Sequence, residues 1–543
     1  MNRHWRLAFI FCGTLLLCFA GGGARLGIAQ ISSEQAATMA DAAPSNLPPD
    51  SFSGMFGIGA LDEDVFVSLA LRINFDRDFW GVGFQLPLRL RVIDKDPKND
   101  RDFAGALRRE DWDEVGDFFR VLRYVYVGQR DKKGPFYVRA GELSELTIGH
   151  GTIMHRYFNG IDQNRWHTGV NAAVNFGAFG VEAMVGDITD PYVAGVRATV
   201  RPLMLILGST ALGHAQYAHE GPGTGADADG EALAEAGSGS GSGSDAGAES
   251  GVSSFASKLV LGTTLMVDSR APIALKTELS DPADVDSAPV TAMDDKGVPI
   301  VTRERALSIV GVDVGYELID TSIFDVTPYV DLNKISIVDQ GWGLHMGVLW
   351  NLSLPVLIDT LVVDLRTEYR RVSHDYVGPY FDTTYEIERY QLLSRGGGEA
   401  AVPKLRALCG PELETCSQGS ASGRNGVFFE LLAGLPNFVF IGGEYLDYDG
   451  GQADGSLRLS LEVPALEIFK LRAFYYRVNI SGLDDLFELD DRSAIMASVE
   501  IPMYAVLSLQ ARWWRVWQPA PGAEDGFEAV DDWSIGVGFS LEI

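Results

Sequence analysis

Residues 65–75 read VFVSLALRINF, with apolar side chains at every odd-numbered position. This alternation is typical of a β-strand with one apolar and one polar face. After a short polar turn, residues 80–92 repeat the pattern as WGVGFQLPLRLRV, and further copies occupy 170–176, 179–185 and 194–201. The sequence therefore predicts an all-β fold built from consecutive antiparallel strands.

The lengths of the strands and of their connections narrow the choice of all-β fold. Many strands run to about 10 residues or more, the length that a tilted strand needs to cross a bilayer, whereas strands average about 5–6 residues in soluble proteins. Short connections, such as 177–178 and 201–202, alternate with long ones, such as 144–166 and 217–255. Past position 29 no apolar stretch of about 18 residues is found, so no membrane-spanning helix is expected. Short turns at one rim and long loops at the other are typical of transmembrane barrels.

The end of the chain carries the most specific signal. Residues 533–543 read WSIGVGFSLEI and alternate to the last position. This strand and the repeated alternation resemble bacterial outer-membrane β-barrels of the porin-like kind, although such barrels more often end in an aromatic residue than in Ile543. The resemblance implies an outer-membrane location among lipids and recognition of the strand Trp533 to Ile543 by the barrel assembly machinery.

The resemblance sets the expected architecture, a transmembrane antiparallel up-and-down β-barrel. With both termini in the periplasm, our tally gives about 22 strands, and we expect an even number in the range 16–24. Aromatic residues near strand ends are expected in interfacial girdles, with ordinary core positions as the alternative. These aromatic residues are Tyr475, Tyr476, Trp513, Trp514 and Trp517.

Targeting and composition agree with export. Basic residues at positions 3–6 precede an apolar run, and Gly27-Ile28-Ala29 has the small-x-small form of a signal-peptidase site, so residues 1–29 are a predicted signal peptide. We expect 30–52 to be a short N-terminal segment and 53–543 to be the barrel. The net charge of −30 would become −33 in the mature chain. This acidic balance argues against nucleic acid as a partner.

The polar phase of several strands carries charge, which is expected to face a water-filled lumen. Nine residues are the lumen-lining candidates: Arg72, Arg89, Arg91, Arg197, Arg201, Asp364, Arg366, Glu368 and Arg370.

One early long loop mixes aromatic and ionisable residues. In porins such a loop folds into the lumen and narrows the channel, so the resemblance makes this loop a constriction candidate, with an ordinary extracellular loop as the equal alternative. Residues 378–390 are a second candidate for folding inward. The ionisable residues of the first loop are His150, His155, Arg156, Asp162 and Arg165.

Two further segments have distinctive compositions. Cys409 and Cys416 lie close together, which in an oxidising compartment favours a local disulfide, while a two-cysteine metal site or two unpaired thiols stay open. Residues 218–255 combine Gly-Ser repeats with scattered acids, so we expect a disordered, solvated loop. The spacing of these acids matches no calcium-binding loop.

Signals for enzymatic chemistry are poor. The chain has no G-x-S-x-G elbow and no H-E-x-x-H motif, although His345 on a polar strand phase leaves a Ser-His pair open. We expect no enzyme, no cofactor and no metal. The expected function is an outer-membrane channel for passive passage of small solutes or ions. The alternatives are a barrel transporter or exporter of a larger or apolar molecule gated by inward-folded loops, and a surface structural or adhesion barrel.

The ion preference depends on where the charges lie. Many acids fall in expected loops, where salt screens them beyond about 8–10 Å, while the expected wall contributes arginines. Charges at the narrowest point of a pore control passage most strongly. From the sequence we expect only a weak cation preference, and the oligomeric state stays open.

Overall fold

The computed structural model contains one large antiparallel sheet that closes on itself. The sheet has 21 strands, of which the two-residue strand β15 (Ile319–Asp320) pairs only with one neighbour, so the closed ring contains 20. The C-terminal strand pairs with the first strand from Ser51↔Glu542 to Gly59↔Ser534, which closes the ring. The predicted antiparallel barrel is confirmed, and 20 strands fall inside the expected range, two below the central tally.

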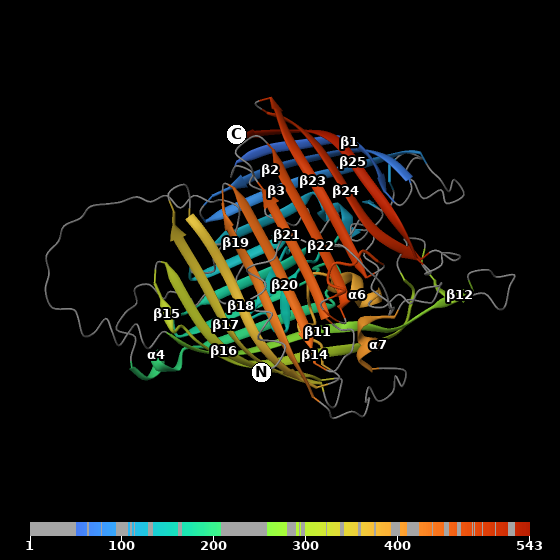
Figure 1. Ribbon diagram of the computed structural model, residues 1–543. Coiled ribbons are helices and arrows are strands. Elements are labelled where there is room, and N and C mark those ends of the chain that lie inside the picture. The colour runs from blue at the N-terminus through green and yellow to red at the C-terminus, as the bar shows by residue number, and fades with distance from the viewer. Residues whose placement is uncertain are drawn as a thin grey trace, which may run out of the picture.

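The strands of the ring follow one another in chain order (Figure 1). They are β1 (Ser51–Leu61), β2 (Asp64–Asp76), β3 (Trp80–Ile93), β4 (Leu122–Gly128), β5 (Phe136–Gly141), β8 (Gly169–Asn175), β9 (Phe179–Val185), β10 (Val193–Val200), β11 (Leu259–Leu275), β14 (Val301–Tyr316), β16 (Phe324–Ile335), β17 (Trp342–Pro355), β18 (Thr360–Val372), β19 (Arg424–Leu435), β20 (Val439–Tyr448), β21 (Gly455–Val463), β22 (Lys470–Ile480), β23 (Ser493–Tyr504), β24 (Leu507–Pro519) and β25 (Phe527–Glu542).

Smaller elements lie in the connections. They are two hairpins, β6 (Leu146–Ile148) with β7 (Met154–Tyr157) and β12 (Thr277–Leu279) with β13 (Pro289–Thr291), and the helices α3 (Val115–Phe119), α4 (Pro202–Leu207), α6 (Tyr385–Gln391) and α7 (Lys404–Cys409). No helix in the described part of the chain is long and apolar enough to cross a membrane.

The structure describes a defined set of residues. These are 50–61, 64–77, 79–93, 107–108, 111–112, 115–128, 134–160, 166–207, 258–279, 289–292, 294, 299–321, 323–336, 341–356, 360–373, 376–391, 402–409, 423–436, 438–449, 455–463, 469–480, 482, 484–490, 492–504, 506–519 and 527–542. The expected signal peptide 1–29, most of the segment 30–52 and the loop 218–255 lie outside them.

Strand lengths differ strongly around the ring. β4, β5, β8, β9 and β10 have 6 to 8 residues, whereas β11 and β14 have 17 and 16. The short strands flank the connection between β5 and β8. This connection turns into the lumen and does not lengthen the strands. The strands on both sides of it are therefore short.

One expected connection differs from the structure. We expected a short turn at 201–202 and a separate long loop at 217–255 on the opposite rim. In the structure β10 ends at Val200 and the next strand of the ring among the described residues is β11, so 201–258 is one connection. Because strand direction alternates, this connection starts and ends at the same rim as the short turns 77–79 and 176–178. Apolar residues 202–207, which suited a strand, form helix α4 instead.

Candidate functional site

The two faces of the wall have opposite character. On β16, the outward Val330 and Leu332 are exposed, while Asp331 and Asn333 at the alternate positions are buried inside the ring. The outward residues of β25, such as Ile535 and Val537, are exposed and apolar as well. A closed ring satisfies every strand edge, and an apolar outer face suits contact with lipid. The chain is an outer-membrane β-barrel.

Adjacent aromatic residues divide between these faces, which corrects part of the expected girdles. Trp514 is 4% exposed and packs with Met496 inside the ring. Tyr476, on the same strand phase as the lumen-facing Arg472, is half-buried toward the inside. Two neighbouring residues of a strand cannot both face lipid, because side chains alternate between faces.

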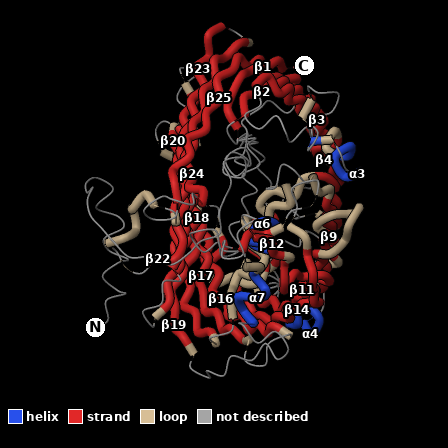
Figure 2. Tube along the Cα trace, turned by 90° about the vertical axis from the view of Figure 1, so that its right-hand side faces the viewer, coloured by secondary structure: helices blue, strands red, loops and turns tan. Residues whose placement is uncertain are grey.

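Two segments fold into the barrel and together form what we call the plug. The plug comprises 142–160, which contains the β6–β7 hairpin, and the part of 376–409 that contains α6 and α7. The backbone nitrogen of His155 donates to Phe381 O at 2.9 Å, and the nitrogen of Phe381 donates to Ile153 O at 3.1 Å. Figure 2 shows α6 and α7 inside the closed outline of the strands, toward one end of it. The plug therefore fills one side of the lumen.

Apolar packing joins the plug to the wall. Met154, Tyr157 and Phe381 have no exposed surface, and they belong to one buried cluster with wall residues such as Met266 and Ile309. Burial of large apolar side chains contributes about 1.5–3 kcal/mol each. The plug is thus packed as a protein core and not as a loosely placed loop.

Helix α6 is fixed to β11 by a buried carboxylate. Arg389 donates to Asp268 through Nε at 2.8 Å, and Tyr385 donates its hydroxyl to the same carboxylate at 2.6 Å. The neighbouring Glu386 accepts hydrogen bonds from Tyr157 and Tyr192, so it joins both plug segments to the wall. These contacts bring together α6, β11, β7 and the residue that precedes β10.

A second contact holds α7 against α6. Lys404 Nζ lies 2.5 Å from Glu388 and 3.2 Å from Asp382. Burial raises the pKa of Glu388, and the charge of Asp382 adds to this shift. Burial alone would lower the pKa of Lys404, but the two carboxylates raise it. The lysine therefore stays charged and ties the two short helices together.

Strand β7 of the plug hairpin contacts β19 and β20. His155 Nε2 lies 3.3 Å from Glu430, and Arg156 bridges Glu430 at 3.0 Å and Glu444 at 3.1 Å. Arg458 on β21 pairs with Glu444 at 3.1 Å. The two wall carboxylates are therefore each matched by a guanidinium group.

A polar row on β17 and β18 lies beneath the plug. Glu368 receives Arg366 Nη2 at 2.5 Å and Arg370 Nε at 2.8 Å. His345 contacts Glu368 at 2.5 Å through Nδ1 and the Tyr376 hydroxyl at 3.0 Å through Nε2. No serine is among the hydrogen-bond partners that the described residues give His345. Within the described part of the chain, His345 therefore links the wall carboxylate Glu368 to Tyr376 at the edge of the plug.

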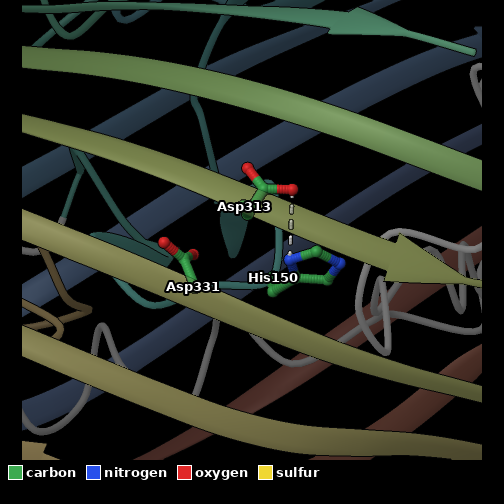
Figure 3. A group of neighbouring side chains, drawn as sticks. All are labelled: His150, Asp313 and Asp331. Atoms are coloured by element: carbon green, nitrogen blue, oxygen red, sulfur yellow. Dashed lines mark ion pairs between the residues drawn. The ribbon is translucent and has the colours of Figure 1, made fainter. Parts of the chain in front are cut away.

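The turn of the hairpin reaches the wall at β14 and β16. His150 Nδ1 lies 3.6 Å from Asp313, and the adjacent wall carboxylate is Asp331 (Figure 3). The His150 ring stacks on Tyr329 with centroids 4.2 Å apart. Arg197 donates to both oxygens of Asp313, at 2.5 and 3.0 Å. Imidazole and carboxylate groups can hold a metal ion, so this cluster is considered again below.

The other side of the lumen contains a cavity of about 300 Å³. It is bounded by β1–β3, by β22–β25 and by residues at the edge of the plug, such as Phe158 and Gly160. Seven basic residues line it against two acids, Glu142 and Glu500. The basic residues are Arg72, Arg89, Arg120, Arg123, Lys470, Arg472 and Arg512.

The nine expected lumen residues lie in several different environments. Arg72 and Arg89 line the cavity. Arg197, Arg366, Glu368 and Arg370 face inward but are buried under the plug. Of the rest, Arg201 is buried at the rim, Asp364 is half-buried, and Arg91 pairs with Asp64 at 3.0 Å.

The expected constriction residues are only partly visible. His150 and His155 are buried where the plug meets the wall, and Arg156 is half-buried there. Asp162 and Arg165 lie outside the described residues, as does Cys416, and the side chain of Cys409 is not described. The disulfide therefore stays a prediction.

Sequence reasoning missed the wall carboxylates that receive the plug. They are Asp268, Asp313, Asp331, Glu430 and Glu444, and each lies on the inward phase of a long strand. Extending the alternation through residues 309–315, IVGVDVG, would have placed Asp313 on the lumen side. Their partners in the plug could not have been found, because these come from loops distant in the sequence.

Comparisons with known proteins give only a structural likeness. No family model matches the chain, and no curated protein matches it. The crystal structure of Pseudomonas aeruginosa OccK11 (OpdR) is similar at 10% identity over 92% of this chain and 99% of that chain, with a TM-score of 0.30. A BenF-like porin from Pseudomonas fluorescens is similar at 8% identity, over 91% and 98%, with a TM-score of 0.31. Wzi, described as a carbohydrate-binding outer-membrane β-barrel from Escherichia coli, is similar at 9% identity, over 91% and 85%, with a TM-score of 0.30. Values this low assign no family and no substrate.

Proposed function

We propose that this barrel is a passive channel whose passage runs through the cavity beside the plug and favours small anions. The observation that carries the proposal is the basic lining of that cavity, seven basic residues against two acids. A closed barrel with a polar lumen provides the water-filled path, and charges close to a constriction act at short range. Ion pairs with Asp111 and Glu462 offset part of the basic charge.

This proposal replaces the weak cation preference expected from the sequence. That expectation gave weight to acids in the loops, whose effect salt screens beyond about 8–10 Å. Beneath the plug, wall carboxylates neutralise the wall arginines, because Asp313 pairs with Arg197 and Glu368 pairs with its two neighbouring arginines. The basic residues that line the cavity lie beside the passage instead. The local balance at the passage is therefore basic although the whole chain is acidic.

Reversal potentials of the purified barrel in a planar bilayer with a KCl gradient test the proposal. Discrete conductance steps are expected. The reversal potential should lie closer to the equilibrium potential of chloride than to that of potassium. Arg512→Gln, which removes one positive charge from the cavity, should move the reversal potential toward the equilibrium potential of potassium. Lys334→Gln, on an outward position of β16, is the matched control and should leave it unchanged. Cation selectivity of the unmodified barrel, or no conductance in repeated trials, would contradict the proposal.

The second candidate is a transporter of a larger molecule that is gated by the plug. The packed interface between plug and wall favours it, because such a plug could block the lumen until a partner displaces it. Conductance that appears only after the plug is loosened would support this candidate over the open channel.

A further inference from the structure

The cluster at the turn of the plug hairpin brings one imidazole and two carboxylates together. His150 comes from the turn between β6 and β7, Asp313 from β14 and Asp331 from β16 (Figure 3). Their ligand atoms all lie within 4.8 Å of one another, and each residue is more than nine-tenths buried. Three segments therefore meet at one enclosed point.

The two carboxylates are an unfavourable pair by themselves. Asp313 and Asp331 are directly opposite each other in the register of β14 and β16. Like charges directly opposite in a sheet are destabilising, and burial removes the water that would screen them. The pair therefore needs positive charge close to both residues.

Among the described residues, Arg197 is the cation beside the pair, and it makes a direct contact with only one of the two carboxylates. Arg197 makes a two-point contact with Asp313. Asp331 accepts a hydrogen bond from the Thr152 hydroxyl through Oδ2 and makes no ion pair with a described residue. Its Oδ1 is buried with no hydrogen-bond partner in the described part of the protein. A buried carboxylate oxygen without a partner is costly, so the arrangement favours a further positive ligand.

The other histidine cluster of the plug shows the contrast. His155, Glu430 and Glu444 are as close together as the first group. There, Arg156 contacts both carboxylates and Arg458 contacts Glu444, so each acid has a cationic partner. Of the four carboxylates in the two clusters, Asp331 is the one for which the described residues show no ion pair.

We propose that His150, Asp313 and Asp331 bind a divalent transition-metal ion of the Zn²⁺ class. Imidazole nitrogen and carboxylate oxygen are both ligands of Zn²⁺, and three protein ligands leave a fourth position for water. The Arg197 contact to Asp313 then orients a ligand, as outer partners of metal ligands do. The ion ties the plug hairpin to two wall strands, and this does not depend on which solute the barrel passes.

Metal binding to the purified, folded barrel tests the site. After chelator treatment, Zn²⁺ alone is titrated by calorimetry, and bound zinc is measured by elemental analysis. One Zn²⁺ per chain is expected for the unmodified protein. Asp331→Asn keeps the shape of the side chain but removes its charge, and should weaken binding at least about tenfold. Asp325→Asn, the same change nearer the start of β16, should bind as the unmodified protein does.

A second readout reports the histidine ligand. Co²⁺ in place of Zn²⁺ should give visible absorption bands with the unmodified protein that are lost in His150→Ala. Correct folding of each variant is verified by heat-dependent mobility on gels. Failure of the unmodified barrel to bind, equal binding by Asp331→Asn, or equal losses in Asp325→Asn would overturn the site. None of these outcomes bears on the channel proposal, whose test measures reversal potentials and not bound metal.

Discussion

At the scale of single residues, the plug is held by wall carboxylates whose partners come from distant segments. Asp268 on β11 receives Arg389 and Tyr385 from α6, about 120 residues later in the sequence. Glu430 receives side chains from a hairpin more than 270 positions earlier. Each contact is buried, so removal of one partner leaves a charge without compensation.

Asp268→Asn is predicted to loosen the plug. It leaves the Arg389 guanidinium buried without its counter-charge, which costs about 3–5 kcal/mol at the contact. The barrel should stay closed because the strands do not depend on Asp268, while single-channel conductance and its fluctuations should increase. Asp190→Asn, which alters an exposed ion pair with Arg270, is the control and should change neither. Identical recordings for both variants would show that α6 does not limit passage.

Glu317 gives a pH-dependent prediction. Burial raises the pKa of Glu317 to about 7, while Arg201 opposes the shift. Because the folded pKa exceeds the unfolded value, the stability that this group contributes is present at low pH and is lost as pH rises toward 7. Glu317→Gln should therefore stabilise the barrel by about 1–2 kcal/mol at pH 8, a value reduced because nearby solvent screens the charge. At pH 4 the substitution should have no effect on stability. Urea unfolding at several pH values measures this, and a pH-independent difference would refute it.

The sequence predicts the face of a residue but not its partners. Alternation placed Arg366 and Arg370 on the inward phase, and the structure buries them beneath the plug. Nothing local indicates that Glu368 between them takes both guanidinium groups, because that contact depends on side-chain directions. Loop segments carry no periodicity, so the fit of His150 against β14 could not be derived.

At the scale of elements, the strands were predictable because alternation with period two is a strong signal over ten or more residues. Elements that break the pattern were not. The apolar run 202–207 is short, and nothing in its composition distinguishes the helix α4 from a strand. The connection between β10 and β11 was consequently divided in two by the sequence prediction.

The seam between β1 and β25 yields a prediction about closure. Gly57 is opposite Gly536, and a Cβ atom at Gly57 would lie 2.9 Å from the carbonyl oxygen of Ile535. Gly57→Val must push the two strands apart, so a loss of about 1–3 kcal/mol in stability is expected. Ile58→Val, at the adjacent outward position, should stay within about 0.5 kcal/mol of the unmodified protein. Urea midpoints of the folded barrel compare the two, and equal midpoints would contradict tight packing at the seam.

At the scale of the whole molecule, the plug divides the lumen into two unlike parts. One side is packed with apolar and ion-paired side chains between β8 and β20. The other side keeps a cavity with basic walls between β1–β3 and β22–β25. The net charge of the chain does not describe the passage, since only two of the acids that the structure describes, Glu142 and Glu500, line the cavity.

Cysteine labelling in the cavity tests the central claim, that solutes pass beside the plug, most directly. With Cys409 and Cys416 replaced by Ser, Ser498→Cys places a thiol on the cavity wall, and Val537→Cys places one on the outward face. During single-channel recording, a bulky anionic methanethiosulfonate reagent should lower the conductance of Ser498→Cys and shift its selectivity toward cations, because it narrows the passage and adds negative charge. Val537→Cys should be unaffected. Labelling of Ser498→Cys that is proven by mass yet leaves the conductance unchanged would contradict the account.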